Sequence, residues 1–428
     1  MKKTIIILFL IFSTLLLVSC GKTGQVEGEL VIWWPGGSPA ERAAIDQAKE
    51  LYEELHPEVT IKIIPQATSN FYMDYLMSLG GNSFPDIAYV DHVYVQQLVY
   101  NNALLNLSDY EVENVKDLFI DSLWAPNTYE DNVYALPFSA NVLTTVYNKT
   151  LLEEVLGREI TSDDIPDNYD DLLEISAKIM AYNQEKGLTG ENQYTPYTIP
   201  AGNENESMGA MAYLSYVSRL GGKIISDDLK TMLLDQEPAF LAAQKIKELG
   251  DLNYVNPFFE EGRFESGKIG FIEMGPWKMR EYERISEQRN IEFGYAPIIK
   301  LDDDLGRNSS LGLYSLVVTK KSINAELAVD FIKFITTNDE LQLLHNTAQN
   351  LMPATKSALE DEFYDSDTWS IYKEQLNSNV ARPGSPEWAE MERQLAGFVT
   401  ALLNGSREPD YVYSLNIALQ MILDEIYS

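Results

Sequence analysis

Apolar residues between positions 30 and 101 alternate between the spacing of a strand and the spacing of a helix. Leu30–Trp34 is a short apolar run that ends at a proline and two glycines. Ser38–Glu41 then has the form of a helix capping box with proline at the first helical position. The pattern predicts strands over 30–34, 59–64 and 86–90, and helices over 39–55, 71–79 and 93–101. Such alternation is typical of a parallel sheet with helices on its faces.

The rest of the chain is richer in helical spacing. It predicts helices over 172–182, 208–220, 238–249, 277–286, 325–336, 339–345, 388–403 and 414–427, with a strand over 315–319. Loops rich in Asn, Glu and Tyr separate the middle helices. We therefore expect an α/β protein with a second, helix-richer lobe from which the chain returns to the first.

The first 20 residues have the pattern of a secretory signal. Lys2 and Lys3 precede an apolar stretch over 5–18, and Leu17–Cys20 resembles the lipobox of bacterial lipoproteins. An uncleaved membrane anchor is the alternative, but the apolar run is shorter than the ~20 residues that span a bilayer. We expect residues 1–20 to be the signal peptide, Cys20 to carry lipid, and 21–28 to be a tether. The protein is then exported and anchored to the cell membrane, on its extracellular face or in a periplasm.

Composition narrows the classes of function. The chain is 45% hydrophobic and 11% aromatic, as expected of a globular protein, and its net charge is -33. Such a surface repels nucleic acid. The three histidines are isolated and Cys20 is the only cysteine, so we expect no metal site and no cofactor. A glycosidase needs two facing carboxylates, and 65 acidic residues leave that possibility open.

Several short motifs recur in a fixed order along the chain. They are Leu30–Trp33, Phe84–Ile87, Asn102–Leu107, Tyr134–Pro137 with Val146–Lys149, Phe264–Lys268 with Met274–Trp277, the helix Ala325–Thr337, and Met352–Pro353. In this order they resemble the extracellular carbohydrate-binding proteins of ABC importers, the group that includes maltose-binding protein. The resemblance covers nearly all of the chain that follows the signal.

The resemblance implies a two-lobed periplasmic-binding-protein-like fold with a ligand cleft between the lobes. It implies a hinge crossed near Ser139–Val142, Ser309–Gly312 and Asn350–Pro353. The expected lobes are 29–141 with 311–350, and 142–310 with 351–428. The implied function is capture of a sugar or oligosaccharide and its delivery to the permease of an ABC importer, by a monomer without enzymatic activity. An exported glycan-processing enzyme, a glycoside hydrolase, is the alternative, and a surface adhesion or scaffold protein is the third.

Aromatic and amide side chains are the first candidates for a sugar site, because sugars have apolar C–H faces as well as hydroxyl groups that both donate and accept. By motif, Trp277 corresponds to the family's stacking tryptophan, although a core position is the alternative. Trp33 and Trp34 must face opposite sides of a strand, and we expect Trp34 to face the cleft. Asn141 falls where relatives place a polar sugar-binding side chain; a turn role at the hinge is equally compatible.

Other candidates come from position alone. Ligands of parallel sheets bind at the carboxyl ends of strands, which indicates Ser38, Asp91 and His92; His92 could instead serve the cap of the next helix. The remaining candidates are Asn203 in a polar loop, Gly312 and Tyr314 near the second crossing, where glycine would let backbone N–H groups approach a ligand, and Trp388 at the start of a late helix.

Overall fold

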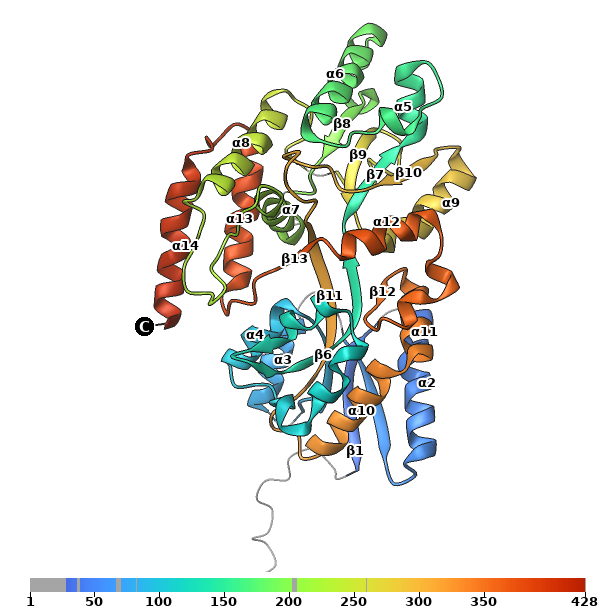
Figure 1. The fold of residues 1–428 in the computed structure, drawn as a ribbon, viewed down its shortest axis with the longest axis vertical. Coiled ribbons are helices and arrows are strands. Elements are labelled where there is room, and N and C mark those ends of the chain that lie inside the picture. Colours follow the sequence, from blue (N-terminus) through green and yellow to red (C-terminus); the bar gives the residue numbers. More distant parts are fainter. Residues whose placement is uncertain are drawn as a thin grey trace, which may run out of the picture.

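The computed structural model describes residues 28–36, 39–66, 71–81, 83–201, 206–258 and 260–427. Cys20, Ser38 and Asn203 lie outside these residues, as do the expected signal segment 1–20 and the expected tether up to residue 27. Figure 1 shows two lobes, one above the other, connected by strands that run between them.

The first lobe is built on a mixed sheet in the order β12-β6-β11-β3-β1-β2, with β13 beside β11. Its strands are β1 (Glu29–Pro35), β2 (Thr60–Gln66), β3 (Ile87–Asp91), β6 (Ala135–Val142), β11 (Ser309–Val318), β12 (Met352–Pro353) and β13 (Asn379–Ala381). Strand β1 is parallel to β2 and β3, which confirms the predicted parallel arrangement. Strand β11 is antiparallel to β3 and β6, so the sheet as a whole is mixed.

Helices cover both faces of this sheet. They are α2 (Pro39–Leu55), α3 (Phe71–Gly80), α4 (Val93–Tyr100), α10 (Ala325–Thr337) and α11 (Asp339–Gln349). Trp33 packs with α3 and α4 on one face, and Trp34 packs with α2, α10 and α11 on the other. The two tryptophans therefore face opposite sides, as their adjacency in a strand requires.

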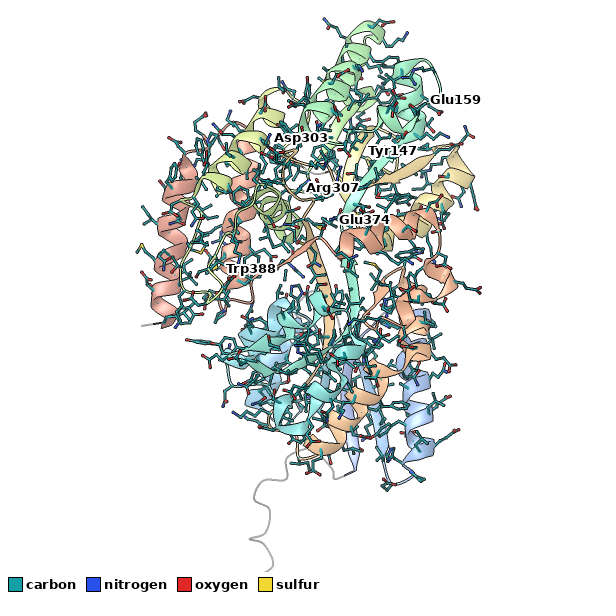
Figure 2. All side chains as sticks on the ribbon, viewed as in Figure 1. Tyr147, Glu159, Asp303, Arg307, Glu374 and Trp388 are labelled. Carbon is teal, nitrogen blue, oxygen red and sulfur yellow. The ribbon has the colours of Figure 1, made fainter. Side chains whose placement is uncertain are left out.

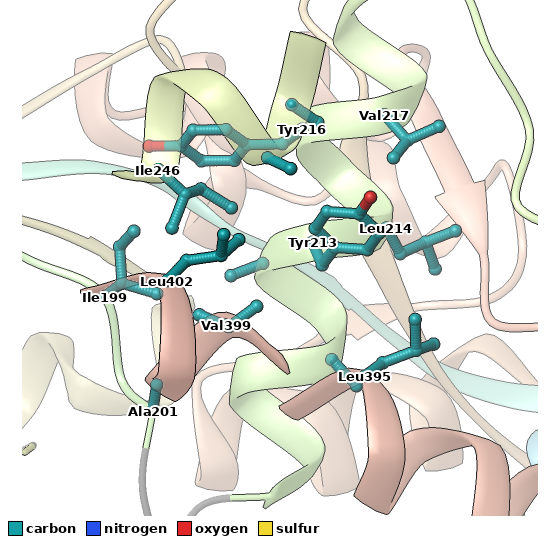
Figure 3. Close-up of a cluster of buried hydrophobic side chains, with 14 of the residues drawn as sticks. Ile199, Ala201, Tyr213, Leu214, Tyr216, Val217, Ile246, Leu395, Val399 and Leu402 are labelled. Atoms are coloured by element: carbon teal, nitrogen blue, oxygen red, sulfur yellow. The ribbon is translucent and has the colours of Figure 1, made fainter. Parts of the chain in front are cut away.

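The second lobe has a smaller sheet in the order β10-β7-β9-β8. Its strands are β7 (Thr144–Asn148), β8 (Thr195–Thr198), β9 (Ile269–Met274) and β10 (Phe293–Ala296), and its helices are α5 (Lys149–Leu156), α6 (Tyr169–Lys186), α7 (Glu206–Arg219), α8 (Glu237–Asp251), α9 (Met279–Arg289), α13 (Trp388–Leu403) and α14 (Tyr411–Tyr427). Side chains of α7, α8 and α13 form the core of this lobe (Figure 3).

The chain passes between the two sheets close to two of the expected crossings. Strand β6 of the first sheet ends at Val142, and β7 of the second begins at Thr144. The return is made by the segment between β10 and β11, which enters the first sheet at Ser309. The expected crossings at 139–142 and 309–312 therefore contain the end of β6 and the start of β11, respectively.

The third expected crossing, at Asn350–Pro353, differs from the structure. Strand β12 pairs with β6, and Met352, Ala354 and Tyr364 pack in the core of the first lobe. The chain stays with the first lobe until α12 (Asp367–Leu376) and β13, which pairs with the start of β11. Only with α13 does it enter the core of the second lobe. The sequence did not reveal this difference because residues 350–353 form a short buried segment, and no local sequence pattern indicates which sheet such a segment joins.

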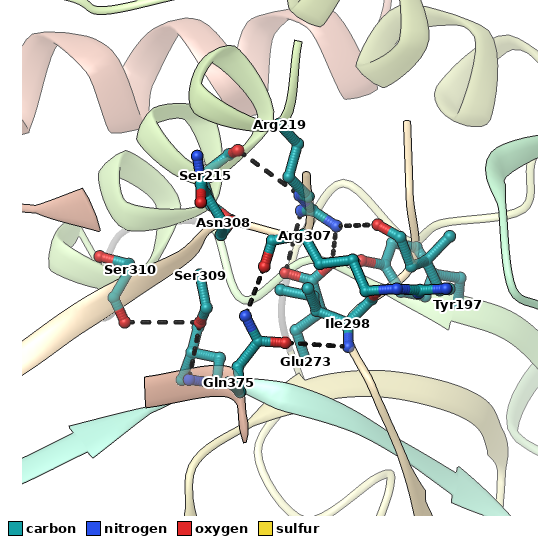
Figure 4. Close-up of polar contacts among 12 residues, drawn as sticks. Tyr197, Ser215, Arg219, Glu273, Ile298, Arg307, Asn308, Ser309, Ser310 and Gln375 are labelled. Carbon is teal, nitrogen blue, oxygen red and sulfur yellow. Dashed lines mark hydrogen bonds and ion pairs between the residues drawn. The ribbon is translucent and has the colours of Figure 1, made fainter. Parts of the chain in front are cut away.

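A buried polar network supports the segment that returns to the first lobe. Arg219 Nη1 lies 2.9 Å from Glu273 Oε1 and donates to the carbonyl of Ile299 at 2.8 Å. The hydroxyl of Tyr197 donates to the same Glu273 oxygen at 2.8 Å. Gln375 of α12 accepts from the Ile298 N–H at 3.3 Å (Figure 4). Since Arg219 and Glu273 are almost fully buried, each depends on the other for compensation of its charge.

Candidate functional site

A cleft of about 910 Å³ lies between the lobes and near the upper end of the range typical of small-molecule sites. From the first lobe it is lined by Pro35, Gly36, Pro65, Gln66, Tyr89, Asp91, Asn141, Gly312, Tyr314, Gln349 and Leu351. From the second lobe and the segment after β13 it is lined by Ser207, Met208, Met211, Trp277 and Arg382. We call these residues the ligand cleft. The first-lobe residues include the ends of β1, β2 and β3, where the strand-end rule predicts a ligand site.

Trp277 presents an indole ring to the ligand cleft. It lies directly after β9, in a short 3-10 turn that begins with Pro276. The ring packs against the backbone of Gly275: a Cβ at that glycine would lie 1.7 Å from Cζ3 of the indole. The side chain stays 36% exposed. The Gly-Pro-Trp sequence thus fixes a flat aromatic surface at the cleft.

Tyr89 and Tyr314 form a second aromatic surface of the ligand cleft. Their rings stack at a centroid distance of 5.2 Å with 13° between the planes. Burial, with a smaller contribution from the Asp91 charge, raises the pKa of Tyr314 to about 12. Its phenol therefore stays protonated near neutral pH and is able to donate as well as accept a hydrogen bond.

Trp34 does not face the ligand cleft, contrary to expectation. It is 1% exposed and packs beneath Tyr89 at a centroid distance of 4.8 Å, with Phe138 and His345 on its other sides. The physical reason is that helices cover both faces of the sheet, which buries inner parallel strands on both sides. Neither tryptophan of β1 then reaches the ligand cleft, and from the neighbouring strand β3 it is Tyr89 that lines it.

Asn141 and Gly312 are direct partners across β6 and β11, and both line the ligand cleft. A Cβ at Gly312 would lie 2.3 Å from Oδ1 of Asn141. Glycine at this position therefore leaves room for the Asn141 amide. This role differs from the expected one, in which the glycine lets backbone N–H groups approach the ligand. That amide has donors and an acceptor of the kind that hydroxyl groups require.

Asp91 contributes a charge to the ligand cleft that Arg382 compensates. Nη2 of Arg382 lies 2.7 and 2.6 Å from the two carboxylate oxygens. Burial acts to raise the pKa of Asp91, but the charge of Arg382 and the hydrogen bond from His92 outweigh it, so the pKa is well below its usual range. Among the described residues of the ligand cleft, Asp91 and Arg382 are the only ionised groups. The described lining is therefore close to neutral.

His92 lies beside this ion pair but does not line the ligand cleft. Its ring is 2% exposed, and Nδ1 lies 3.0 Å from Asp91 Oδ1 and 3.2 Å from the carbonyl of Leu313. It precedes α4 without a side-chain capping bond. The strand-end rule placed this residue near the site, but its ring packs against Asp91 and the Leu313 carbonyl and does not line the cleft.

Trp388 is a core residue instead of a stacking residue. It is 1% exposed in the core of the second lobe, and its Nε1 donates to Glu392 at 3.3 Å. Figure 2 labels it at the start of α13. The position at a helix start does not itself expose the ring, because α13 packs against α7 and α8 from its first turn onward.

Several residues of the ligand cleft have no counterpart among the sequence candidates. They include Gln66, Tyr89, Ser207, Met208, Met211, Gln349 and Arg382. Gln66 ends β2, and the strand-end rule could have found it had the strand been predicted two residues longer. Arg382 joins Asp91 across 291 positions of sequence, a pairing that no local pattern signals.

Among the described residues, no group of three or more His, Cys, Asp or Glu side chains is arranged to hold a metal ion. No helix in the same part of the chain combines the length and apolar character that a membrane span requires.

Comparison with known proteins identifies close counterparts of this architecture. Residues 47–369 match the family described as bacterial extracellular solute-binding protein. The galactooligosaccharide-binding protein of Bacillus subtilis (strain 168) is 21% identical over 439 aligned positions, covering 95% of this chain and 94% of that protein.

Two solved structures share the fold over nearly the whole chain. The cyclic alpha-maltosyl-1,6-maltose binding protein of Arthrobacter globiformis has a TM-score of 0.79 at 21% identity, covering 94% of this chain and 100% of that one. The GacH receptor of Streptomyces glaucescens GLA.O, solved unliganded and with acarbose, has a TM-score of 0.75 at 21% identity, covering 94% and 99%. The predicted two-lobed fold is confirmed.

Proposed function

Because the chain belongs to the family of bacterial extracellular solute-binding proteins, we propose that it captures a sugar or oligosaccharide in the ligand cleft and delivers it to the permease of an ABC importer. The observation that carries this proposal is the partly exposed indole of Trp277 in the same cleft as the amides of Gln66, Asn141 and Gln349. A flat apolar surface with nearby amides matches the two chemical faces of a pyranose.

The charge of the cleft supports a neutral ligand. Asp91 and Arg382 bind each other, and the described lining has no other ionised group. The cleft volume of about 910 Å³ has room for more than one sugar ring. The oligosaccharides named for the relatives above are consistent with this class.

A thermal-shift panel tests the proposal. Neutral mono- and oligosaccharides are compared with amino acids, peptides and polyamines. A ligand at about 100 times its Kd should add ~2.7 kcal/mol to the free energy of unfolding. The Trp277→Ala variant is the matched control, since it should lose the shift for the sugar that works best. A shift with a peptide or polyamine and with no sugar would contradict the proposal.

We further propose that the lobes close on the ligand. Both lobes contribute side chains to the cleft, and a ligand that contacts both favours the closed form. In place of the expected lobe boundaries we propose 29–142 with 309–381, and 144–308 with 382–427. Small-angle scattering should give a smaller radius of gyration at saturating sugar, and an unchanged curve would count against closure.

Binding is proposed to occur without cleavage of the ligand. Glycoside hydrolysis uses two carboxyl groups across the scissile bond. Among the described cleft residues Asp91 is the only carboxylate, and Arg382 occupies both of its oxygens. Incubation with the best-binding oligosaccharide, followed by chromatography, should return it intact. Cleavage beyond one turnover per protein would favour the glycoside hydrolase.

The proposed location of the protein in the cell rests on residues around Cys20, which lie outside the described part of the chain. We propose that the protein is exported, that Cys20 carries lipid, and that it acts as a membrane-anchored monomer; the apolar run before Cys20 supports export and the lipid anchor. After cell fractionation, the Cys20→Ser variant should leave the membrane fraction. Retention as firm as that of the parent would contradict the lipid anchor.

A further inference from the structure

An arginine of the second lobe bonds to the end of a first-lobe helix near the ligand cleft. Arg280 lies in the first turn of α9, and its Nη1 and Nη2 donate to the carbonyl groups of Ala348 and Thr347 at 2.8 and 2.7 Å. Both carbonyl groups belong to the last turn of α11. Figure 1 shows α9 in the upper lobe and α11 in the lower. The two hydrogen bonds therefore connect the lobes directly.

The end of α11 is a favourable place for a guanidinium group. The last four carbonyl groups of a helix have no partner within the helix, and the helix dipole gives them a partial negative charge. In α11 the backbone after the helix turns back at Asn350 and donates to Asn346 and Thr347, while Arg280 supplies a donor to Ala348. The planar fork of the guanidinium lets one side chain bond two carbonyl groups at once.

The contact depends on how the lobes are placed, because each helix is anchored in its own lobe. Tyr282 and Ile285 of α9 pack with Met274 of β9 in the second lobe, and α11 packs against α2 in the first. Met279, at the start of α9, is buried against the core of the first lobe. The first turn of α9 therefore lies where the lobes meet, and an opening larger than the reach of the Arg280 side chain breaks both hydrogen bonds.

Arg280 and its partners lie next to two residues of the ligand cleft. Trp277 precedes Arg280 by three residues, and Gln349 directly follows Ala348. We propose that Arg280 is a positioning residue, which holds the lobes together at this edge of the cleft and sets the spacing between Trp277 and Gln349. Its use in ligand binding rests on the proposed function, whereas the contact between the lobes does not.

The neighbouring cations of the same segment bond within the second lobe. Lys278 Nζ lies 2.6 Å from Glu281 and 3.4 Å from Glu265. Arg284 donates to Gln288 one turn further along α9, at 2.9 Å. Of these three cations, Arg280 is the one whose described hydrogen bonds cross to the first lobe, so Arg284 provides a matched control of the same residue type on the same helix.

The position of the lobes can be measured without any ligand. Cys20 is the only cysteine, so the Cys20→Ser chain is free of cysteine and accepts spin labels at chosen sites. Glu50→Cys on α2 and Glu287→Cys on α9 place one label on each lobe, at side chains that are exposed. Pulsed electron paramagnetic resonance then gives the distribution of distances between the labels, and from it the ratio of molecules with close lobes to molecules with separated lobes.

Variants of the labelled chain test the role of Arg280. Arg280→Ala should lower the ratio of close to separated lobes by about threefold to fivefold, the size expected for an exposed charge at a helix end. Arg280→Lys should recover part of this loss, because an ammonium group still suits the helix end but lacks the planar fork. Arg284→Ala should leave the distribution as it is in the parent. Melting curves establish that each variant is folded.

Three outcomes would overturn the inference. One is a distance distribution of folded Arg280→Ala that matches the parent, and another is an equal change in Arg284→Ala. The last is a changed distribution with unchanged calorimetric affinity for the sugar of the largest thermal shift, because apparent affinity should fall with the fraction of molecules in the binding-competent form. A chain that bound no sugar would contradict the proposed function instead, since the distance measurement needs no ligand.

Discussion

Truncation of Trp277 gives the sharpest separation between a ligand surface and a core residue. The ring is 36% exposed in the absence of ligand. Since a tryptophan can bury up to ~250 Å², roughly 90 Å² of it remains for a ligand to cover. At ~25 cal/mol per Å², this area is worth about 2 kcal/mol, which is about a 30-fold change in affinity.

Calorimetry of the parent, Trp277→Ala and Trp277→Phe proteins measures this difference with the sugar that binds best. The alanine variant should bind about 30-fold more weakly, and phenylalanine should recover part of the loss because a smaller ring keeps the flat face. Melting curves without ligand are recorded alongside. Affinity within about threefold of the parent in a clearly destabilised alanine variant would refute the reasoning, because it would assign the ring to the core.

Three further substitutions test the architecture of the site. Gly312→Ala should displace the Asn141 amide, given the 2.3 Å approach, and weaken sugar binding by about tenfold; Gly397→Ala, where the added methyl meets nothing within 4 Å, should leave calorimetric affinity unchanged. Asp91→Asn should lower the free energy of unfolding by about 3 kcal/mol near neutral pH. Because the folded-state pKa of Asp91 is depressed, its contribution is present above the ordinary carboxyl pKa of ~3.9 and is lost on acidification, so the deficit in urea unfolding should shrink between about pH 5 and pH 2; a deficit independent of pH would contradict this. Glu273→Gln should cost about 3 kcal/mol in the same assay by leaving a buried guanidinium uncompensated, with sugar affinity unchanged because this residue lies outside the described cleft lining.

The parallel strands β1, β2 and β3 and the helices of the first lobe were predictable from their apolar periodicity, whereas β6, β12, β13 and the first half of β11 were not predicted. Helix α13 has the predicted bounds, and α3 and α4 end within one residue of the prediction. The second sheet was not predicted. Its strands have four to six residues, and β9 is buried at every position, so it has none of the alternation that marks a half-exposed strand.

The candidate site was predictable where it depends on strand ends and on the motif at Trp277. It was not predictable where it depends on what covers a surface. Trp34 and Trp388 are as aromatic as Trp277, and only the packing of distant helices buries them. Arg382 escaped prediction because its role exists only through contact with Asp91.

The different environments of the tryptophans give this protein an optical property. All six lie in the described part of the chain; Trp277 is 36% exposed, and none of the other five exceeds 7%. Indole emission moves to longer wavelength in water, and soluble quenchers reach only exposed rings. The long-wavelength, quenchable part of the intrinsic fluorescence therefore originates at a single ring in the ligand cleft. A sugar that covers it should shift the emission to shorter wavelength and protect it from acrylamide, so occupancy of the cleft can be followed in the unlabelled protein.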